Sequence, residues 1–121
     1  MNKGTILTTE PLNDWKPDDV RNWLQEHAEQ HDLAVAMSAV WNKAGWLHHE
    51  LNDDSPTVTK EYYRKWRILE EELFFKIVTI LENETGNKID LNKTGWTNAI
   101  ALFMERNGFC NGSGWWIKKE E

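Results

Sequence analysis

Cysteine is almost absent from this sequence, because Cys110 is the only one in 121 residues. No disulfide can form within the chain, and a short chain without disulfides is typical of a reducing compartment. No apolar run reaches the roughly 20 residues of a membrane-spanning helix. Residues 1–11 also lack the apolar stretch of a signal peptide. We therefore expect a cytoplasmic protein with no membrane partner.

Positive charge is scarce as well: 14 Lys and Arg stand against 20 Asp and Glu, for a net charge of −6. Proteins that bind nucleic acid neutralise phosphates with clustered Lys and Arg, so we expect no nucleic-acid partner. The Gly-x-Ser-x-Gly pattern of a nucleophilic serine and the Gly-Lys-Ser/Thr pattern of a phosphate loop are both missing. These absences favour a non-catalytic protein, although they leave the question of an enzyme open.

Tryptophan, by contrast, is abundant, with eight residues. Four of them fit apolar stripes at helical spacing and are predicted to lie in the core: Trp23, Trp41, Trp66 and Trp96. Three others fit less well and are predicted to form a binding surface: Trp46, Trp115 and Trp116. An exposed tryptophan is a common anchor of protein interfaces.

The predicted tail covers residues 109–121, and its turn-forming residues 112–114 permit a reversal of the chain. In an extended segment, successive side chains point to opposite sides. We therefore predict that Trp115 and Ile117 pack on the body of the protein while Trp116 stays partly exposed. The roles of the two tryptophans are exchanged if the chain turns the other way.

Apolar residues recur at helical spacing in four segments. The first expected helix runs from Pro17 to about residue 28, and the second covers about 33–52. The third is the clearest, with Thr57 or Thr59 as its N-cap and an end at Gly86, which can adopt the left-handed cap. The fourth covers about 95–107.

The remaining segments are short. Residues 1–16 show no helical period and are predicted to form an N-terminal arm, and residues 89–91 are a candidate extended piece. The sequence thus predicts one all-α domain over 1–121. It is a bundle of about four helices with a short, folded-back, Trp-rich C-terminal tail.

A basic cluster marks the start of the third expected helix. Lys60, Arg64 and Arg67 share one face of that helix, which makes them a candidate site for a small anion. Arg67 can instead pair with Glu71, because residues four apart are neighbours on a helix. The consecutive acids at 70–72 are expected to spread around the helix as a solvated face.

Histidines and acids offer a candidate metal site. His48, His49 and Asp53 lie together near the end of the second expected helix, and His27 and His31 share a face of the chain further upstream. In an antiparallel hairpin of helices, roughly 24 Å would separate the two histidine pairs, so one metal ion cannot join them. We therefore expect no cofactor, and keep the metal site as an alternative.

Two short segments resemble parts of known families. Residues 14–24 carry Asp14-Trp15, Val20 and Trp23-Leu24, a pattern that resembles the opening of a sterile alpha motif domain. The Leu-Gly pair that leads the closing helix of those domains is missing. A second pattern resembles the helical region of nitrile hydratase beta subunits and their accessory proteins, and would imply a subunit or chaperone role. It consists of Ala36-Met37 and Tyr62-Tyr63-x-x-Trp66-x-x-Leu69-Glu70. Neither segment is long enough to assign the chain to the family.

Taken with the tryptophans, these observations favour a non-catalytic binding or adaptor protein that acts through a protein partner. One alternative is a small metal-dependent hydrolase that uses the histidine and acid clusters. Another is a homodimer that buries the Trp-rich end.

Overall fold

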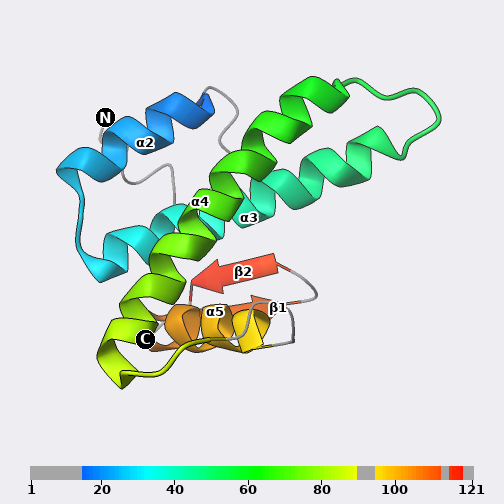
Figure 1. The fold of residues 1–121 in the computed structure, drawn as a ribbon. Coiled ribbons are helices and arrows are strands. Elements are labelled where there is room, and N and C mark those ends of the chain that lie inside the picture. The colour runs from blue at the N-terminus through cyan, green and yellow to red at the C-terminus, as the bar shows by residue number, and fades with distance from the viewer. Residues whose placement is uncertain (1–14, 90–94, 113–114, 119–121) are drawn as a thin grey trace.

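The computed structural model describes residues 15–89, 95–112 and 115–118, with the backbone alone for 95–97 and 115. Within these residues the chain forms four helices followed by a β-hairpin (Figure 1). The elements are α2 (Pro17–Glu26), α3 (Gln30–Leu51), α4 (Lys60–Thr85), α5 (Gly95–Arg106), β1 (Phe109–Gly112) and β2 (Trp115–Lys118). None of the described helices has both the length and the apolar character needed to cross a membrane.

The prediction of a mostly helical protein is confirmed, but the tail is a two-stranded antiparallel sheet rather than a single folded-back segment. Most of the predicted arm at 1–16 and of the extended piece at 89–91 lies outside the described residues.

Local side chains fix the ends of the helices. Thr59 caps α4, because its hydroxyl oxygen accepts a hydrogen bond from the Tyr62 N–H at 3.1 Å. The same helix ends at Gly86, whose φ of 74° suits glycine, so both predicted ends of α4 are confirmed. Helix α3 begins earlier than predicted, at Gln30, where the Asp32 carboxylate accepts the N–H of the preceding N-cap residue at 3.3 Å.

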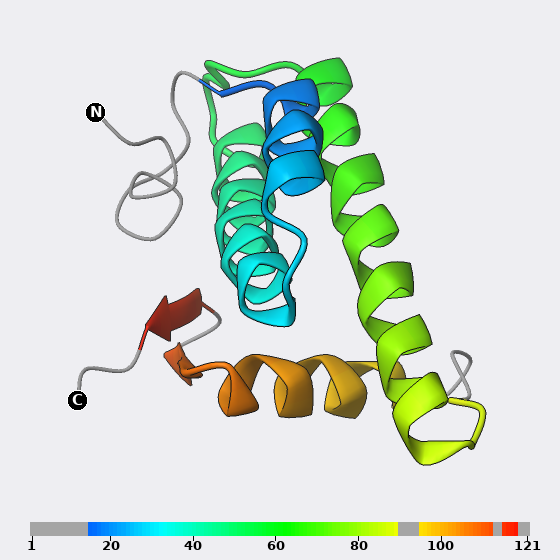
Figure 2. The same ribbon diagram turned by 90° about the vertical axis from the view of Figure 1, so that its left-hand side faces the viewer.

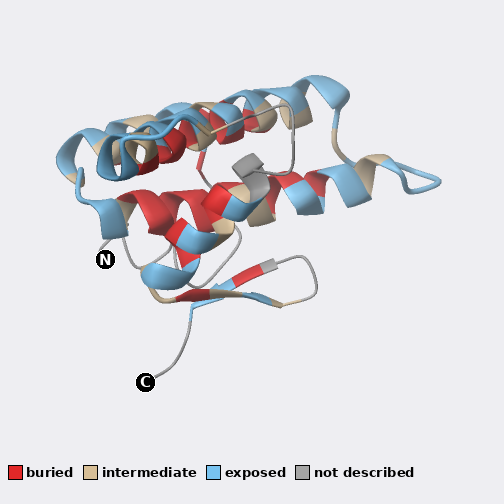
Figure 3. Ribbon diagram, turned by 60° about the horizontal axis from the view of Figure 1, so that its bottom comes forward, coloured by how far each residue is buried: buried red, intermediate tan, exposed pale blue. Residues whose placement is uncertain are grey.

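Helix α3 is the centre of the molecule. It contacts α2, α4, α5 and β2, and every residue from 33 to 40 is buried. A helix with neighbours on all sides is apolar around its whole circumference, so the single predicted stripe was too narrow. Helix α5 runs across the direction of the other three (Figure 2), and burial is concentrated where the helices face one another (Figure 3).

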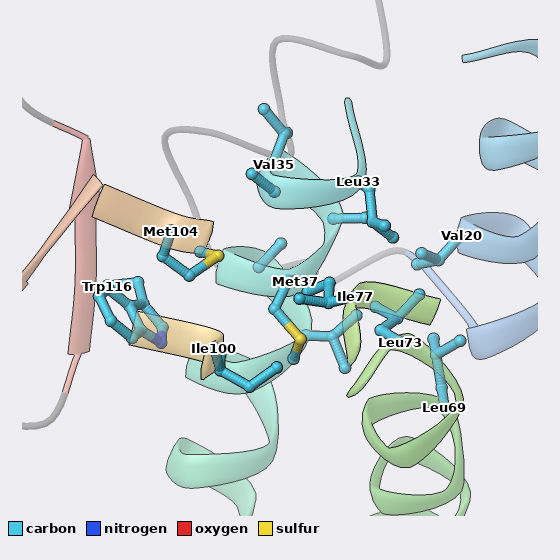
Figure 4. Packing of buried hydrophobic residues seen from close by; sticks show 14 of the residues in the cluster. Val20, Leu33, Val35, Met37, Leu69, Leu73, Ile77, Ile100, Met104 and Trp116 are labelled. Carbon is cyan, nitrogen blue, oxygen red and sulfur yellow. The ribbon is translucent and has the colours of Figure 1, made fainter. Parts of the chain in front are cut away.

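The core takes residues from each of the helices. Val20, Met37, Leu73 and Ile100 converge from α2, α3, α4 and α5 respectively (Figure 4). Trp66 and Leu73 are fully buried, as predicted, and Trp23 is buried as well. Trp41 is only partly buried against this core, and the side chain of Trp96 lies outside the described residues.

The register of the hairpin decides which tail residues face the helices. Asn111 pairs with Trp116, which places Trp116 on the same face as Phe109. Both aromatic side chains are buried, whereas Ile117 is 53% exposed. The prediction of an exposed Trp116 and a packed Ile117 is therefore wrong, because the strand turns its other face to α3. The side chain of Trp115 lies outside the described residues.

Asn42 of α3 fastens strand β2 to the bundle. Its side-chain N–H₂ donates to the Trp116 carbonyl at 2.9 Å, and its side-chain oxygen accepts from the Trp116 N–H at 3.0 Å. The Trp41 ring lies edge-on to the Trp116 ring, with centroids 5.8 Å apart. The amide of Asn42 thus satisfies the backbone groups of Trp116 in place of a further strand.

Two arginine–glutamate pairs join helices that are distant in sequence. Arg21 of α2 donates to both carboxylate oxygens of Glu72 on α4, at 2.9 and 2.7 Å. Arg106 of α5 donates to both oxygens of Glu84 on α4, at 2.8 and 3.0 Å, and also to the side-chain oxygen of Gln30 at 2.6 Å. The contacts of Arg106 link the start of α3 to the ends of α4 and α5.

Candidate functional site: a basic pocket and an apolar helix face

The predicted basic cluster lines a pocket between the end of α3 and the start of α4. Lys60, Arg64 and Arg67 form its α4 side, and His48 and Asn52 stand opposite. Leu51 and Tyr63 complete the lining of this pocket of about 420 Å³. The structure therefore brings the three predicted anion ligands together and adds a second wall, supplied by α3.

Two of the three basic side chains in this pocket have no acidic partner among the residues that the structure describes. Arg67 forms an ion pair with Glu70 and lies 3.7 Å from Glu71, so the predicted pairing of Arg67 with Glu71 is confirmed. Lys60 and Arg64 form no ion pair with any residue that the structure describes. Because none of the described residues that line the pocket is Asp or Glu, its two free cations are left to attract an anion.

The acidic run at 70–72 was predicted to form a solvated face, and the structure shows that it does not. Glu70 is buried, with 7% of its side chain exposed, because Arg67 covers it. Glu72 meets Arg21, whose hydrogen bonds lower the pKa of this glutamate. Only Glu71 is well exposed, at 58% of its side chain. Buried carboxylates need such partners, since an unpaired charge in the interior is costly.

A buried lysine of α3 packs against the first part of α4. Lys43 of α3 is 4% exposed, and its ammonium lies 5.3 Å from the ring centroid of Trp46, 5.9 Å from that of Tyr62 and 5.8 Å from that of Trp66. Attraction to the ring faces offsets part of the cost of removing the ammonium from water. Trp46, one of the three predicted surface tryptophans, is 37% exposed, so part of its ring covers Lys43 and the rest reaches solvent.

A second candidate surface lies along α2 and α4, and sequence reasoning missed it. Ile68 and Phe75 of α4 are 49% and 58% exposed. They are separated by two helical turns, which puts them on one face of the helix. The signal was present in the sequence, because these two residues are left over from the inward stripe of α4 and repeat at i and i+7.

Each of these two residues borders a pocket between α2 and α4. Ile68 lies at a pocket of about 390 Å³ with Lys65 of α4 and Arg21 of α2. Phe75 lies at a pocket of about 460 Å³ whose other apolar lining residues are Leu24, Ala28, Leu33 and Ile80. Arg21, in the lining of the first pocket, is paired with Glu72 of α4. We call this surface, from Ile68 to Phe75 with both pockets, the α2–α4 face.

Two of the histidines pack against aromatic rings instead of converging on a shared metal site. The His27 ring stacks on Trp23 with centroids 4.3 Å apart. The His48 ring packs against that of Tyr63 at 5.7 Å. His49 and Asp53 are exposed. Among the residues that the structure describes, no group of three or more His, Cys, Asp or Glu is arranged to hold a metal ion.

Comparison of the chain with known protein families, with curated proteins and with solved structures found no match. The two short resemblances in the sequence, to sterile alpha motif domains and to nitrile hydratase beta subunits, thus gain no support from a family match. A function has to be argued from the two surfaces themselves.

Proposed function

We propose that this protein is a non-catalytic binding protein that takes an amphipathic helix of a protein partner on its α2–α4 face. The observation that carries the proposal is the exposure of Ile68 and Phe75 on one face of α4. A large apolar side chain left in water gains roughly 25 cal/mol for each Å² that a partner later covers. Aromatic residues bring the most such area.

The spacing of the two side chains fits a helical ligand. Ile68 and Phe75 stand at i and i+7, roughly 10 Å apart along the helix axis. In helix-in-groove recognition the bound helix carries its apolar anchors at i, i+3, i+4 and i+7, so its outermost anchors are the same distance apart as Ile68 and Phe75. The pocket beside Phe75, with Leu24 and Ile80 in its lining, offers an apolar recess of the kind into which an anchor inserts.

The charges on the α2–α4 face indicate which charges the partner helix should carry. Lys65 lines the pocket beside Ile68, and Lys76 lines the pocket beside Phe75. The acids of this face, Asp18 and Glu72, are both already paired with Arg21. A helix with apolar residues on one side and Asp or Glu at its flanks would therefore complement the surface.

The test places a photo-reactive amino acid at position 75 and, as a control, at Leu102 of α5, which is 59% exposed. After irradiation in cells, we expect a polypeptide to be cross-linked from position 75 and not from position 102. The cross-linked segment is then made as a peptide. It should become helical on binding and lose at least tenfold in affinity for the Phe75→Ser protein, with a smaller loss for Lys76→Glu.

Three results would overturn the proposal. The first is equal cross-linking from positions 75 and 102. The second is a product that consists of two copies of this chain, which would favour the homodimer. The third is a peptide whose affinity is unchanged by Phe75→Ser.

A further inference from the structure

We propose that the basic pocket between α3 and α4 binds a small phosphorylated molecule through its phosphate group. The pocket and the α2–α4 face are lined by different residues, so this inference does not rest on the proposed function. It rests on four features of the pocket: its free cations, its other hydrogen-bond donors, the occupied carbonyls at the end of α3, and its size.

The positive side chains of the pocket are arranged to receive an anion. Lys60 and Arg64 stand one helical turn apart, with Arg67 on the next turn, so the three positive groups form a row along one side of the pocket. Arg67 is held by Glu70, which fixes its place and leaves the other two for a ligand. A phosphomonoester carries a charge of about −1.5 to −2 at pH 7. Two free cations match that charge.

Both walls supply further donors. His48 of α3 and Tyr63 of α4 pack together, and both carry an N–H or O–H that can be donated to a phosphate oxygen. Among the groups that line the pocket, donors therefore predominate, as an acceptor-rich ligand such as a phosphate requires.

Helix α3 ends at this pocket, and a helix C-terminus repels anions through its unpaired carbonyls. Here three of the last four carbonyls, those of His48, His49 and Glu50, accept hydrogen bonds. The side chain of Asn52 donates to the His48 carbonyl at 3.1 Å. The backbone N–H groups of Asn52 and Asp53 donate to the carbonyls of His49 and Glu50, both at 3.2 Å. The end of α3 thus opposes a bound anion less than an uncapped helix would.

Size distinguishes the ligand from a bare ion. A volume of about 420 Å³ lies in the range of pockets that enclose small organic molecules, roughly 300–1,000 Å³. The rings of His48 and Tyr63 offer apolar area to the organic part. A nucleic-acid strand is a poorer fit, because it needs a longer run of cations than these two.

The experiment is a titration with phenyl phosphate, followed by ¹H–¹⁵N NMR at about 0.15 M salt. We expect saturable shifts of the amides of His48, Lys60 and Arg64. Arg64→Gln and Lys60→Gln should each weaken binding at least tenfold. The matched control is Lys65→Gln, which removes one charge from the next position of α4 but from the lining of a different pocket. It should change the affinity less than twofold.

Titrations with inorganic phosphate and with benzoate test the phosphate group and the ring separately. Phosphate should bind at the same residues but more weakly, and benzoate more weakly than phenyl phosphate. Shifts that do not saturate, or an equal loss in Lys65→Gln and Arg64→Gln, would overturn the proposal. So would tighter binding of a single-stranded RNA than of phenyl phosphate. The variant Phe75→Ser should keep phosphate binding, which separates this site from the α2–α4 face.

Discussion

At the scale of single residues, Leu73 and Ile68 of α4 show how differently one helix treats two aliphatic side chains. Leu73 is fully buried and Ile68 is 49% exposed. Leu73→Ala should lower the free energy of unfolding by about 2–5 kcal/mol, because it leaves a cavity in the core. Ile68→Ala should change it by no more than about 0.5 kcal/mol. Urea denaturation of both variants measures the difference, and similar losses in the two would show that the wrong face of α4 has been assigned to the core.

Apolar side chains such as Leu73 could be placed from the sequence, because periodicity alone selects the inward face of a long helix. Lys43 and Glu70 could not be placed in that way. A charged residue is expected in solvent by default, and its burial depends on partners that the rest of the fold supplies. For Lys43, two of the three surrounding rings come from α4. For Glu70, the deciding partner is Arg67, one turn away, and the sequence paired that arginine with Glu71.

At the scale of elements, the ends of α4 were predictable because Thr59 and Gly86 act locally. The orientation of the hairpin was not, because it depends on which strand residue comes to lie opposite α3. A shift of one residue exchanges every side chain between the two faces. The segment 115–117 is apolar on both of its sides, so its composition offered no preference for burying Trp116 rather than Ile117.

Asn42 makes the orientation of the hairpin testable. Asn42→Leu removes both side-chain hydrogen bonds to Trp116 while keeping the branching and the number of heavy atoms of the side chain, and should destabilise the protein by about 1–3 kcal/mol. Hydrogen exchange of the Trp116 amide should accelerate more than that of amides in the centre of α3. The control is Asn83→Leu on the exposed surface of α4, which should leave both quantities nearly unchanged. An unaltered exchange rate at Trp116 in Asn42→Leu would refute the role given to Asn42.

At the scale of the whole molecule, acid should loosen the contacts between helices. Hydrogen bonds from Arg21 lower the pKa of Glu72, and hydrogen bonds from Arg106 lower that of Glu84. A carboxyl whose pKa is lower in the folded state stabilises that state above its unfolded pKa, about 4.3 for glutamate. This contribution disappears as the pH falls through the lower, folded value.

We therefore expect the Tm to decline on acidification below about pH 4.3. Glu72→Gln keeps the shape of the side chain but cannot titrate, so its Tm should fall less steeply over the same range. The difference will be modest, because 42% of the Glu72 side chain is exposed and solvent screens the pair. Thermal melts of both proteins between pH 2 and 7 decide the matter, and parallel curves would show that the pair between Arg21 and Glu72 does not contribute.

The same scale explains what the sequence revealed of the candidate sites. The row of Lys60, Arg64 and Arg67 was visible, because it lies on one helix. Its opposite wall, with His48 and Asn52, appears only when α3 and α4 fold against each other. The α2–α4 face is likewise shared by two helices. Only Ile68 and Phe75 of α4, which repeat at i and i+7, could have been recognised in the sequence.

The bonds between Asn42 and Trp116 join residues 74 positions apart, and this separation has a consequence for local unfolding. The hairpin can dock only after α4 and α5 have carried it back to α3. Closing such a loop costs entropy that few local contacts repay. We therefore expect the hairpin to detach at a lower free energy than the bundle of α2, α3 and α4 needs to unfold. In that open form the chain offers an extended segment to proteases and uncovers the ring of Trp41. Limited proteolysis should accordingly cut within 107–118 first, and leave a helical fragment behind.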